Sequence, residues 1–507
     1  MRSPPMANGC GVRRLIFNPS SPLDYALFLK IKSLPKYRFV GDFAEVPEEY
    51  LDRLGLATGS GSTSNYLPME GLFDYQRDIA ALAILKRRYA VFADCGLGKT
   101  LIATEFARHA LANIPRHQSI LIVSPLMVIG QTIAEAKRFY GDALPIEQVH
   151  ARDLAAWLTS RYRRIGITNY DALNDSIPSG NLGGLILDES SMLKSHYGKW
   201  GATCIRLGRG LTWKLALTGT PAPNDRIEFA NHAVFLDQFP TVNSFLSRFF
   251  INRGQTQNRW ELKAHAIRAF YRALSHWCIF LSNPATYEWK DNVGTIPPIQ
   301  VHIHDIALTS AQRMMVQETT GNLFAAELGG ITTRSKLGQI SKGNCNGQKI
   351  ETLKPAFIRD MAMSQPDRST IIWCHYNAEQ EALAALLPEA GNITGDTPIH
   401  ERIRVVDEFK TGRRRLLITK GKILGFGQNM QICTRMIFSG LQDSYETFYQ
   451  CVKRANRVGS TEPLDVHIPV TEVERPMLDT VLRKAKRVQQ DTQEQERIFK
   501  EISDAAR

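Results

Sequence analysis

The stretch VFADCGLGKT, residues 91–100, is the part of the sequence that indicates the fold most directly. It joins the end of an apolar run to a glycine turn, and a segment with helical patterning follows from Lys99. Strand, glycine turn and helix in this order form the context of a phosphate-binding loop. The strict pattern G-x-x-x-x-G-K-[ST] requires glycine where this chain has Ala93. The surrounding sequence therefore has to show whether the stretch binds a phosphate.

The residues of this loop have separate chemical tasks. Gly96 and Gly98 let backbone N–H groups turn towards a phosphate, and the helix start adds a positive dipole end. Lys99 then reaches the β- and γ-phosphates, and the Thr100 hydroxyl ligates magnesium. Ala93 sits before the turn itself, at the strand end, where a methyl group is tolerated. The loop predicts ATP and Mg²⁺ as cofactors, whereas a chance turn fits this context less well.

A second site element is needed to hold magnesium and orient water. The run GLILDES, residues 184–190, supplies it, with Asp188 for the metal and Glu189 to polarise the attacking water. The alternative is a strand that ends in solvated acidic residues. That alternative is weaker because such an apolar strand rarely ends in Asp and Glu without a role.

Short apolar runs rich in β-branched residues alternate with helical stretches along most of the chain. Continuous runs of this kind indicate strands buried on both faces, as in a parallel sheet covered by helices. We expect two α/β domains, of which only the first has a phosphate loop. The runs are residues 89–93, 119–125, 164–169, 184–190 and 214–220 in the first half, and 369–375, 392–396, 413–419, 435–440 and 464–470 in the second.

Composition shifts divide the chain into five parts. An accessory segment ends in the flexible linker ATGSGSTSN, and a segment between the two α/β domains is aromatic-rich, basic and helix-patterned, without strand runs. A charged helix closes the chain. The expected parts are residues 1–70 (accessory segment), 71–225 (ATP-binding domain), 226–297 (helical insertion), 298–470 (second domain) and 471–507 (C-terminal helix).

The bulk composition limits the class of protein. The 507 residues carry a net charge of +12 with a pI near 9.3, which favours a polyanionic partner, although a basic protein that merely stays soluble is the alternative. The eight cysteines are scattered, so neither a disulfide framework nor a zinc site is indicated. No apolar run approaches the ~20 residues of a membrane helix. We expect a cytoplasmic protein without a membrane partner.

In their order, the motifs resemble those of helicase superfamily 2 and, within it, the Swi2/Snf2-like DNA translocases, particularly the short bacterial and phage-borne proteins. The resemblance covers roughly residues 70 to 470. LFDYQRD is similar to the adenine-recognition segment, with Gln76 matching its glutamine, and ADCGLGKT resembles the family form of motif I, which also carries alanine at the position of Ala93. The further matches are LIVSPLMVIGQT, ITNYDAL, LDESSMLKS, ALTGTPAPN, IIWCHYNAEQ, GFGQNMQICTRMIFSG and YQCVKRANRVGS.

The last of these motifs separates subfamilies. Its Gln450, Arg454, Arg457 and Gly459 are closer to the Swi2/Snf2 form than to the DEAD-box or RecQ form, because Lys453 stands where those carry glycine. The chain departs from the family pattern at two places, which bear on its subfamily and not on the ATPase chemistry. Serine follows Gly459 where glutamine is usual, and motif II reads D-E-S-S.

The resemblance implies two RecA-like domains in tandem that hydrolyse ATP in the cleft between them. Arg454 and Arg457, three residues apart on a predicted helix, would reach the γ-phosphate as arginine fingers, although a solvated basic helix face is the alternative. Gln450 and Gly427 would help to bind the nucleotide. Residues implied to couple ATP to nucleic acid are Thr218, Thr220, Gln428 and Asn429.

Backbone-tracking enzymes need phosphate contacts without sequence information. Four hydroxyls at predicted strand ends are candidates for such contacts: Ser124, Thr168, Thr394 and Thr419. The basic stretches at 409–417 and 258–272 add charge and aromatic rings, or are only a solvated face and a core stripe. We find no sequence-reading module, so sequence-independent binding is expected.

Three functions remain open at this point. The first is an ATP-dependent DNA translocase or helicase that acts on double-stranded more readily than on single-stranded DNA, in a bacterial or phage-infected cell. The second is an ATP-gated DNA clamp or scaffold with little turnover, which Glu189 and the two arginines argue against. The third is an RNA helicase, which the Swi2/Snf2-like form of the last motif argues against.

Overall fold

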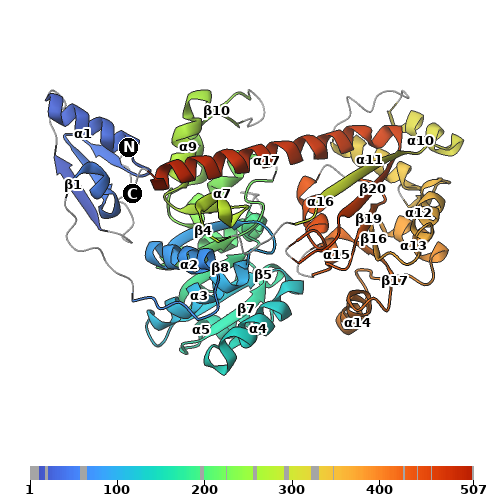
Figure 1. Ribbon diagram of the computed structural model, residues 1–507, viewed down its shortest axis with the longest axis horizontal. Coiled ribbons are helices and arrows are strands. Elements are labelled where there is room, and N and C mark those ends of the chain that lie inside the picture. The colour runs from blue at the N-terminus through green and yellow to red at the C-terminus, as the bar shows by residue number, and fades with distance from the viewer. Residues whose placement is uncertain are drawn as a thin grey trace. The chain divides into compact units, whose positions relative to one another are not determined.

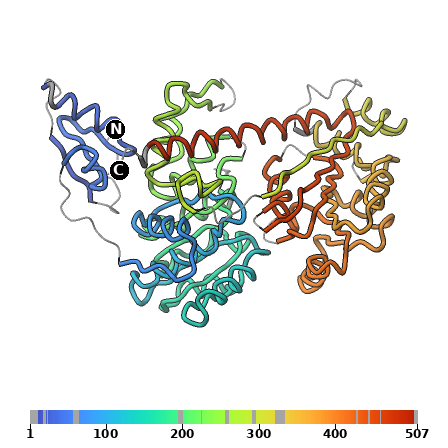
Figure 2. Tube along the Cα trace, viewed as in Figure 1, coloured from blue at the N-terminus to red at the C-terminus, as the bar shows by residue number. Residues whose placement is uncertain are grey.

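The computed structural model divides the chain into two compact units (Figure 1). Unit 1 consists of Met1–Asn292 and Gln490–Arg507, and unit 2 of Val293–Gln489. Figure 2 follows the chain through them by colour. The structure describes residues 11–16, 21–56, 65–193, 199–223, 225–254, 260–290, 296–320, 331–345, 347–425, 429–441, 444–457 and 459–504.

Unit 1 is built on a parallel sheet that has seven strands among the described residues, in the order β12-β4-β9-β8-β5-β7-β6. The five strands that the sequence predicts in the first half are confirmed, and their residues are almost all buried because helices cover them. The strands are β4 (Arg88–Ala93), β5 (Ser119–Ser124), β6 (Ile146–Gln148), β7 (Ile165–Asn169), β8 (Leu182–Asp188), β9 (Trp213–Leu217) and β12 (Cys278–Leu281). The helices next to the site are α2 (Asp74–Lys86), α3 (Lys99–Ala112) and α4 (Leu126–Tyr140).

The predicted helical insertion is wrong in one respect, because residues 226–297 also contain strands. β12 pairs in parallel with β4 and so forms the edge of the first sheet, while β10 (Phe250–Asn252) and β11 (Trp260–Leu262) form an antiparallel ribbon. A run of four apolar residues is too short to be told from a helix by periodicity, so only pairing with β4 reveals this strand. The helices of the segment are α7 (Phe229–Phe235), α8 (Val242–Phe249) and α9 (Ile267–Leu274).

The aromatic rings of this segment belong to the core of unit 1. Phe270 and Tyr271 are buried, and the Phe270 ring meets the rings of Phe229 and Phe245 at centroid distances of 6.0 Å each. From the sequence, the stretch at 258–272 is expected either to help bind nucleic acid or to be only a solvated face or a core stripe. Phe270 and Tyr271 belong to the core.

The described part of the N-terminal segment folds as a small module. Its antiparallel sheet has the order β1-β3-β2, with β1 (Val12–Ile16), β2 (Arg38–Val40) and β3 (Phe43–Pro47). Helix α1 (Pro22–Ser33) buries Ile31 against Ala44 and Val46 of the sheet. The sequence indicated only an accessory segment here, because the strands are short and their apolar pattern is weak.

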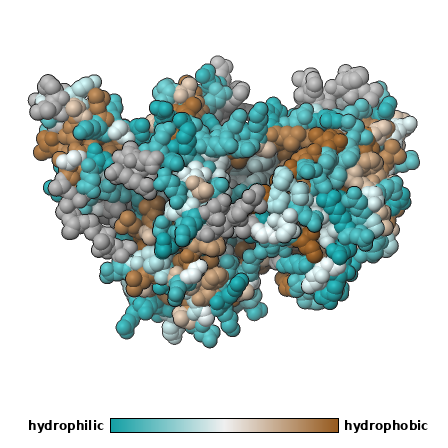
Figure 3. Space-filling view, viewed as in Figure 1, coloured by the Kyte–Doolittle hydropathy of each residue, from teal (hydrophilic) through white to brown (hydrophobic). Residues whose placement is uncertain are grey.

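Unit 2 contains the second parallel sheet, with the order β13-β20-β19-β16-β18-β17 among the described residues. All five predicted strands are present, and β13 is an addition at the edge. Its Ile299, Val301 and Ile303 are exposed, and Figure 3 shows an apolar patch over this strand. The strands are β13 (Ile299–Asp305), β16 (Thr370–Cys374), β17 (Gly391–Asn392), β18 (Leu416–Lys420), β19 (Arg435–Phe438) and β20 (Leu464–Val470).

The predicted C-terminal helix is confirmed as α17 (Arg475–Asp504). Its first part buries Leu478 and Val481 within unit 2. Its last part belongs to unit 1, where Arg226 pairs with Asp491. No helix among the described residues is long and apolar enough to cross a membrane.

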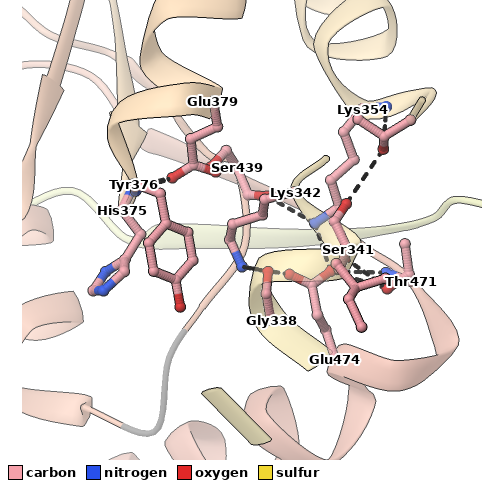
Figure 4. A network of polar contacts seen from close by, with 12 residues as sticks. Gly338, Ser341, Lys342, Lys354, His375, Tyr376, Glu379, Ser439, Thr471 and Glu474 are labelled. Atoms are coloured by element: carbon pink, nitrogen blue, oxygen red, sulfur yellow. Dashed lines mark hydrogen bonds and ion pairs between the residues drawn. The ribbon is translucent and has the colours of Figure 1, made fainter. Parts of the chain in front are cut away.

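A buried ionic network stabilises unit 2 at the ends of β16, β19 and β20 (Figure 4). The ammonium groups of Lys342 and Lys354 lie 2.6 Å and 2.5 Å from the two carboxylate oxygens of Glu474. Lys354 Nζ also donates to the carbonyl of Ser439 at 2.7 Å, and the Ser439 hydroxyl donates to Glu379 at 2.6 Å. Burial alone would raise the pKa of Glu474, but the two lysines hold this pKa at about 2.

We predict that Glu474→Gln destabilises unit 2 by about 3–5 kcal/mol near neutral pH, because two buried ammonium groups lose their carboxylate. The folded-state pKa of Glu474 lies below its ordinary value of 4.5, so this stabilisation is complete above that pH and is lost as the pH falls towards about 2. Urea unfolding near neutral pH and at about pH 3 should show the difference between wild type and variant shrinking in acid. The exposed neighbour Glu472 gives the control Glu472→Gln, and equal unfolding free energies for both variants would contradict the prediction.

Candidate active site

The phosphate-loop stretch forms a strand–turn–helix, as the sequence predicts. β4 ends at Ala93, Gly96 and Gly98 have φ angles of 90° and 70°, and Gly98 is the N-cap of α3. The Lys99 ammonium donates to the backbone carbonyls of Ala93 at 2.8 Å and Asp94 at 3.2 Å. Ala93 itself is fully buried in the sheet. Its methyl group therefore lies outside the turn, which explains why glycine is not needed there.

Gln76 packs directly on this turn. Its Oε1 accepts the Phe73 N–H at 3.1 Å, and its Nε2 lies 3.5 Å from the Leu97 carbonyl oxygen. A Cβ atom at Gly98 would lie only 2.2 Å from Gln76 Nε2. The left-handed backbone favours glycine at position 98, and a side chain there would have to displace the end of Gln76.

Asp188 ends β8, which is separated from β4 by β9 alone. Its Oδ2 accepts the Ser124 hydroxyl at 2.9 Å, and its Oδ1 accepts the Glu189 N–H at 3.1 Å. Burial and the nearby Glu189 carboxylate raise the pKa of Asp188 to about 6, against the opposing effects of Ser124 and Lys99. A cation at this carboxylate would stabilise its charged form.

Glu189 has an unusual backbone with φ of 52°. Its carboxylate is buried apart from a small exposed fraction and accepts the Thr218 hydroxyl at 3.3 Å. Thr218 Oγ1 in turn accepts the Thr220 N–H at 3.1 Å, and the Ser190 hydroxyl lies 3.0 Å from His232 Nε2. A non-glycine residue in the left-handed region costs free energy, and such strain clusters at functional sites.

The residues of unit 1 fit a nucleotide with magnesium. A turn with two left-handed glycines, a helix N-terminus and one ammonium group can hold phosphates, while the Thr100 hydroxyl and the half-buried Asp188 carboxylate are oxygen ligands of the kind Mg²⁺ prefers. When bound, magnesium would neutralise part of the phosphate charge.

Three of the four hydroxyls predicted to contact nucleic-acid phosphates are buried in this conformation. The Ser124 hydroxyl donates to Asp188, as described above. Thr168 donates to the Val149 carbonyl at 2.8 Å, and Thr419 donates to the Ile393 carbonyl at 3.2 Å. In each case the hydroxyl is hydrogen-bonded within its own unit. Thr394 is half-buried and donates to or accepts from Thr397 at 3.1 Å.

The predicted arginine pair lies in unit 2, in a turn and not on a helix. Helix α16 (Tyr445–Val452) ends before Arg454, so the helical spacing expected of Arg454 and Arg457 is wrong. Arg454 is buried and its Nη2 donates to Gln450 Oε1 at 3.0 Å, whereas Arg457 is half-buried and donates to Asn429. Gly427 and Gln428 lie outside the described residues.

Sequence reasoning missed a buried carboxylate on the loop helix. Glu105 accepts the hydroxyls of Tyr66 at 2.5 Å and Tyr140 at 2.7 Å, the Met69 N–H at 3.2 Å, and the guanidinium of Arg108 at 2.9 Å and 3.0 Å. It thereby attaches to α3 the segment that leads into Gln76. The only sequence signal was a single acidic residue on the apolar side of a helical pattern.

The model of the SNF2-related domain matches residues 86–357, more than half of the chain. The chain belongs to the SNF2-related family. The model of the helicase conserved C-terminal domain matches residues 348–459. The predicted membership of superfamily 2, with two RecA-like parallel-sheet domains, is confirmed.

Relatives of this SNF2-family protein include a phage protein. The "Putative protein p41" of Acyrthosiphon pisum secondary endosymbiont phage 1 is 23% identical over 444 residues, which cover 80% of this chain and 94% of that protein. Mouse "DNA annealing helicase and endonuclease ZRANB3" is 22% identical over 421 residues, 78% of this chain but only 38% of that protein. Among solved structures, the "Sulfolobus solfataricus SWI2/SNF2 ATPase core in complex with dsDNA" aligns with a TM-score of 0.40 at 18% identity, covering 87% of this chain and 97% of that one.

We predict that Gly98→Ala lowers the affinity for ADP by roughly 5- to 30-fold, because a left-handed alanine costs roughly 1–2 kcal/mol and its methyl group displaces Gln76. Titration with a fluorescent ADP analogue measures the change. Gly130→Ala is the matched control, since a Cβ atom there meets nothing within 4 Å and the φ angle is ordinary. Equal affinities of the two variants would show that the turn does not hold the nucleotide.

A second prediction concerns the Glu105 attachment. Glu105→Gln should speed amide hydrogen exchange in residues 66–73, because the amide is a weaker acceptor for Tyr66, Arg108 and the Met69 N–H. Tyr66→Phe should act in the same direction. Tyr140→Phe is the control, since Tyr140 lies on α4 and its loss leaves the attachment intact. Unchanged exchange in Glu105→Gln would contradict the role given to this carboxylate.

Proposed function

We propose that this protein hydrolyses ATP at the site in unit 1 and uses the energy to move along, or remodel, double-stranded DNA without sequence preference. The observation that carries the proposal is the Glu189 carboxylate. It is held in a left-handed backbone at the end of β8, bonded to Thr218 at the end of the neighbouring strand β9. A nearly buried carboxylate with this support is suited to orient a water molecule for attack on a phosphate.

In this proposal Lys99 exchanges its two loop carbonyls for phosphate oxygens when ATP binds. Thr100 and Asp188 would hold magnesium, and Glu189 would accept a proton from the attacking water. The Thr218 hydroxyl donates to the same carboxylate, so a change in the protonation or position of Glu189 would alter a contact of the segment after β9. That contact supports Thr218 and Thr220 as the residues that couple hydrolysis to bound DNA.

Unit 2 would contribute an arginine to the phosphate in the working state. Arg457 suits that role better than Arg454, because Arg457 is half-buried whereas Arg454 is buried on Gln450. The family, the basic net charge of +12 and the name of the relative ZRANB3, a DNA annealing helicase, support DNA as the activator. The phage relative supports a role in a bacterial or phage-infected cell.

We predict that Glu189→Gln keeps ATP binding but lowers turnover by roughly 10²–10⁴-fold, the usual contribution of a general base. Lys99→Ala should lose both binding and turnover. The exposed Glu318→Gln is the matched control, expected to behave as wild type. ATP hydrolysis with and without double-stranded DNA, single-stranded DNA and RNA measures these effects, and a triplex-displacement assay measures movement.

The same assay separates the alternatives. Tight ATP-dependent DNA binding with slow turnover in wild type would favour a clamp, and stimulation by RNA alone would favour an RNA helicase. Absence of stimulation by any polynucleotide would exclude the translocase.

A further inference from the structure

A cavity of about 690 Å³ lies in unit 1 at the edge of the first sheet opposite the phosphate loop. Gly183 and Trp213 line it at the N-terminal ends of β8 and β9, whereas Asp188 and the loop follow the C-terminal ends of parallel strands. Helix α3 runs from Lys99 to Ala112, which also lines the cavity. A helix of 14 residues spans about 21 Å, so the cavity is separate from the site described above.

The lining of this cavity is cationic and polar. Among the described residues that line it there is no aspartate or glutamate. Because no carboxylate lines the cavity to repel an anion, its positive charge favours the binding of one. The polar lining consists of the basic side chains of Arg87, Arg108 and His109, the carboxamides of Asn65, Asn113 and Gln118, and the hydroxyl of Thr212.

Arg108 is held in place for such an anion. Its Nε and Nη2 atoms donate to the buried Glu105 carboxylate at 3.0 Å and 2.9 Å, and Nη2 also donates to the Leu67 carbonyl at 2.6 Å. Its Nη1 group has no hydrogen-bond acceptor within the part of the chain that the structure describes. A guanidinium fixed on one side and open on the other loses little conformational entropy when it binds an oxyanion.

Arg87 and His109 both pack against an indole that lines the cavity. The Arg87 guanidinium lies 5.5 Å from the Trp213 ring centroid, and the His109 ring meets the same indole edge-on at 5.6 Å. Arg87 is the C-cap of α2 in a left-handed conformation with φ of 61°, which directs the chain out of the helix at the cavity. Burial and the charges of Arg108 and Arg87 lower the pKa of His109, so its neutral ring offers one donor and one acceptor.

We propose that this cavity binds a ligand that carries a phosphate group. Phosphate oxygens match the donors of Arg87, Arg108 and the carboxamides, and a cavity of this volume has room for a nucleoside attached to the phosphate. The phosphate comes either from a free nucleotide or from the end of a nucleic-acid strand. The proposal does not depend on the proposed function, because it is tested by binding alone.

The test uses the chain of 507 residues with Lys99→Ala, which weakens phosphate binding at the loop. Calorimetric titrations with pyrophosphate, uridine monophosphate, and a short oligonucleotide with or without a 5′-phosphate give the affinities. Adding Arg87→Asn removes a cation while keeping a residue that tolerates the left-handed backbone. This change should weaken binding about tenfold, the expected loss of one charge-assisted contact.

A second variant and a matched control keep the result interpretable. Gln118→Glu adds a negative charge at nearly constant size and should also weaken binding. Arg152→Ala removes an exposed arginine outside the cavity, with a side chain 84% exposed, and should leave binding unchanged. Thermal unfolding of each variant shows whether the fold is intact.

Each outcome decides the proposal. Arg87-dependent binding of pyrophosphate or uridine monophosphate supports a free nucleotide as the ligand, and Arg87-dependent preference for the 5′-phosphorylated oligonucleotide supports a strand end. Failure of every probe to bind would overturn the proposal. Equal effects of Arg87→Asn and Arg152→Ala in a stable protein would also overturn it.

Discussion

The left-handed backbone at Gly98 is the constraint on which the site depends. At this residue the chain leaves a buried strand, turns, and starts α3 with its first N–H groups unpaired within the helix. Gln76 fills the space where a side chain would lie, so the turn is closed on its outer side by α2. The substituted Ala93 has no part in this geometry, because it is buried one step earlier in the sheet. A phosphate loop therefore needs glycine at the turn and not at the strand end.

Parallel pairing brings the remaining groups of the site together. β9 lies between β4 and β8, so the Thr218 hydroxyl, the Glu189 carboxylate and the loop come from adjacent strand ends. The strained turn at Glu189 persists because Asp188, Tyr170 and Ser190 are bonded around it. The tertiary structure thus stabilises a local conformation that the local sequence disfavours.

Two buried glutamates show how each unit uses a carboxylate for structure. Glu105 in unit 1 binds hydroxyls, a backbone N–H and one guanidinium, and holds the segment before Gln76. Glu474 in unit 2 binds two ammonium groups at the ends of three strands. The two lysines that compensate Glu474 lie far away in sequence, whereas Glu105 is compensated by Arg108 three residues further along α3 and binds the more distant Tyr66 and Tyr140. An uncompensated buried carboxylate would cost several kcal/mol. Neither residue belongs to a sequence motif.

The sequence by itself determined the two parallel sheets and the family, and it singled out unit 1 residues that the structure brings together at the ends of β4, β8 and β9. These features rest on local patterns: apolar runs that must be buried on both faces, glycines that must adopt positive φ, and acids that end an apolar strand. Only the tertiary structure decided that β12 joins the first sheet, that Ser124, Thr168 and Thr419 face inward, and that Arg454 and Arg457 follow a helix instead of lying on it. It also assembled Glu105 and the cationic cavity from segments distant in the chain. The physical reason is that edge pairing, the direction of a hydroxyl and the compensation of a buried charge depend on neighbours brought by folding, which no local spacing encodes.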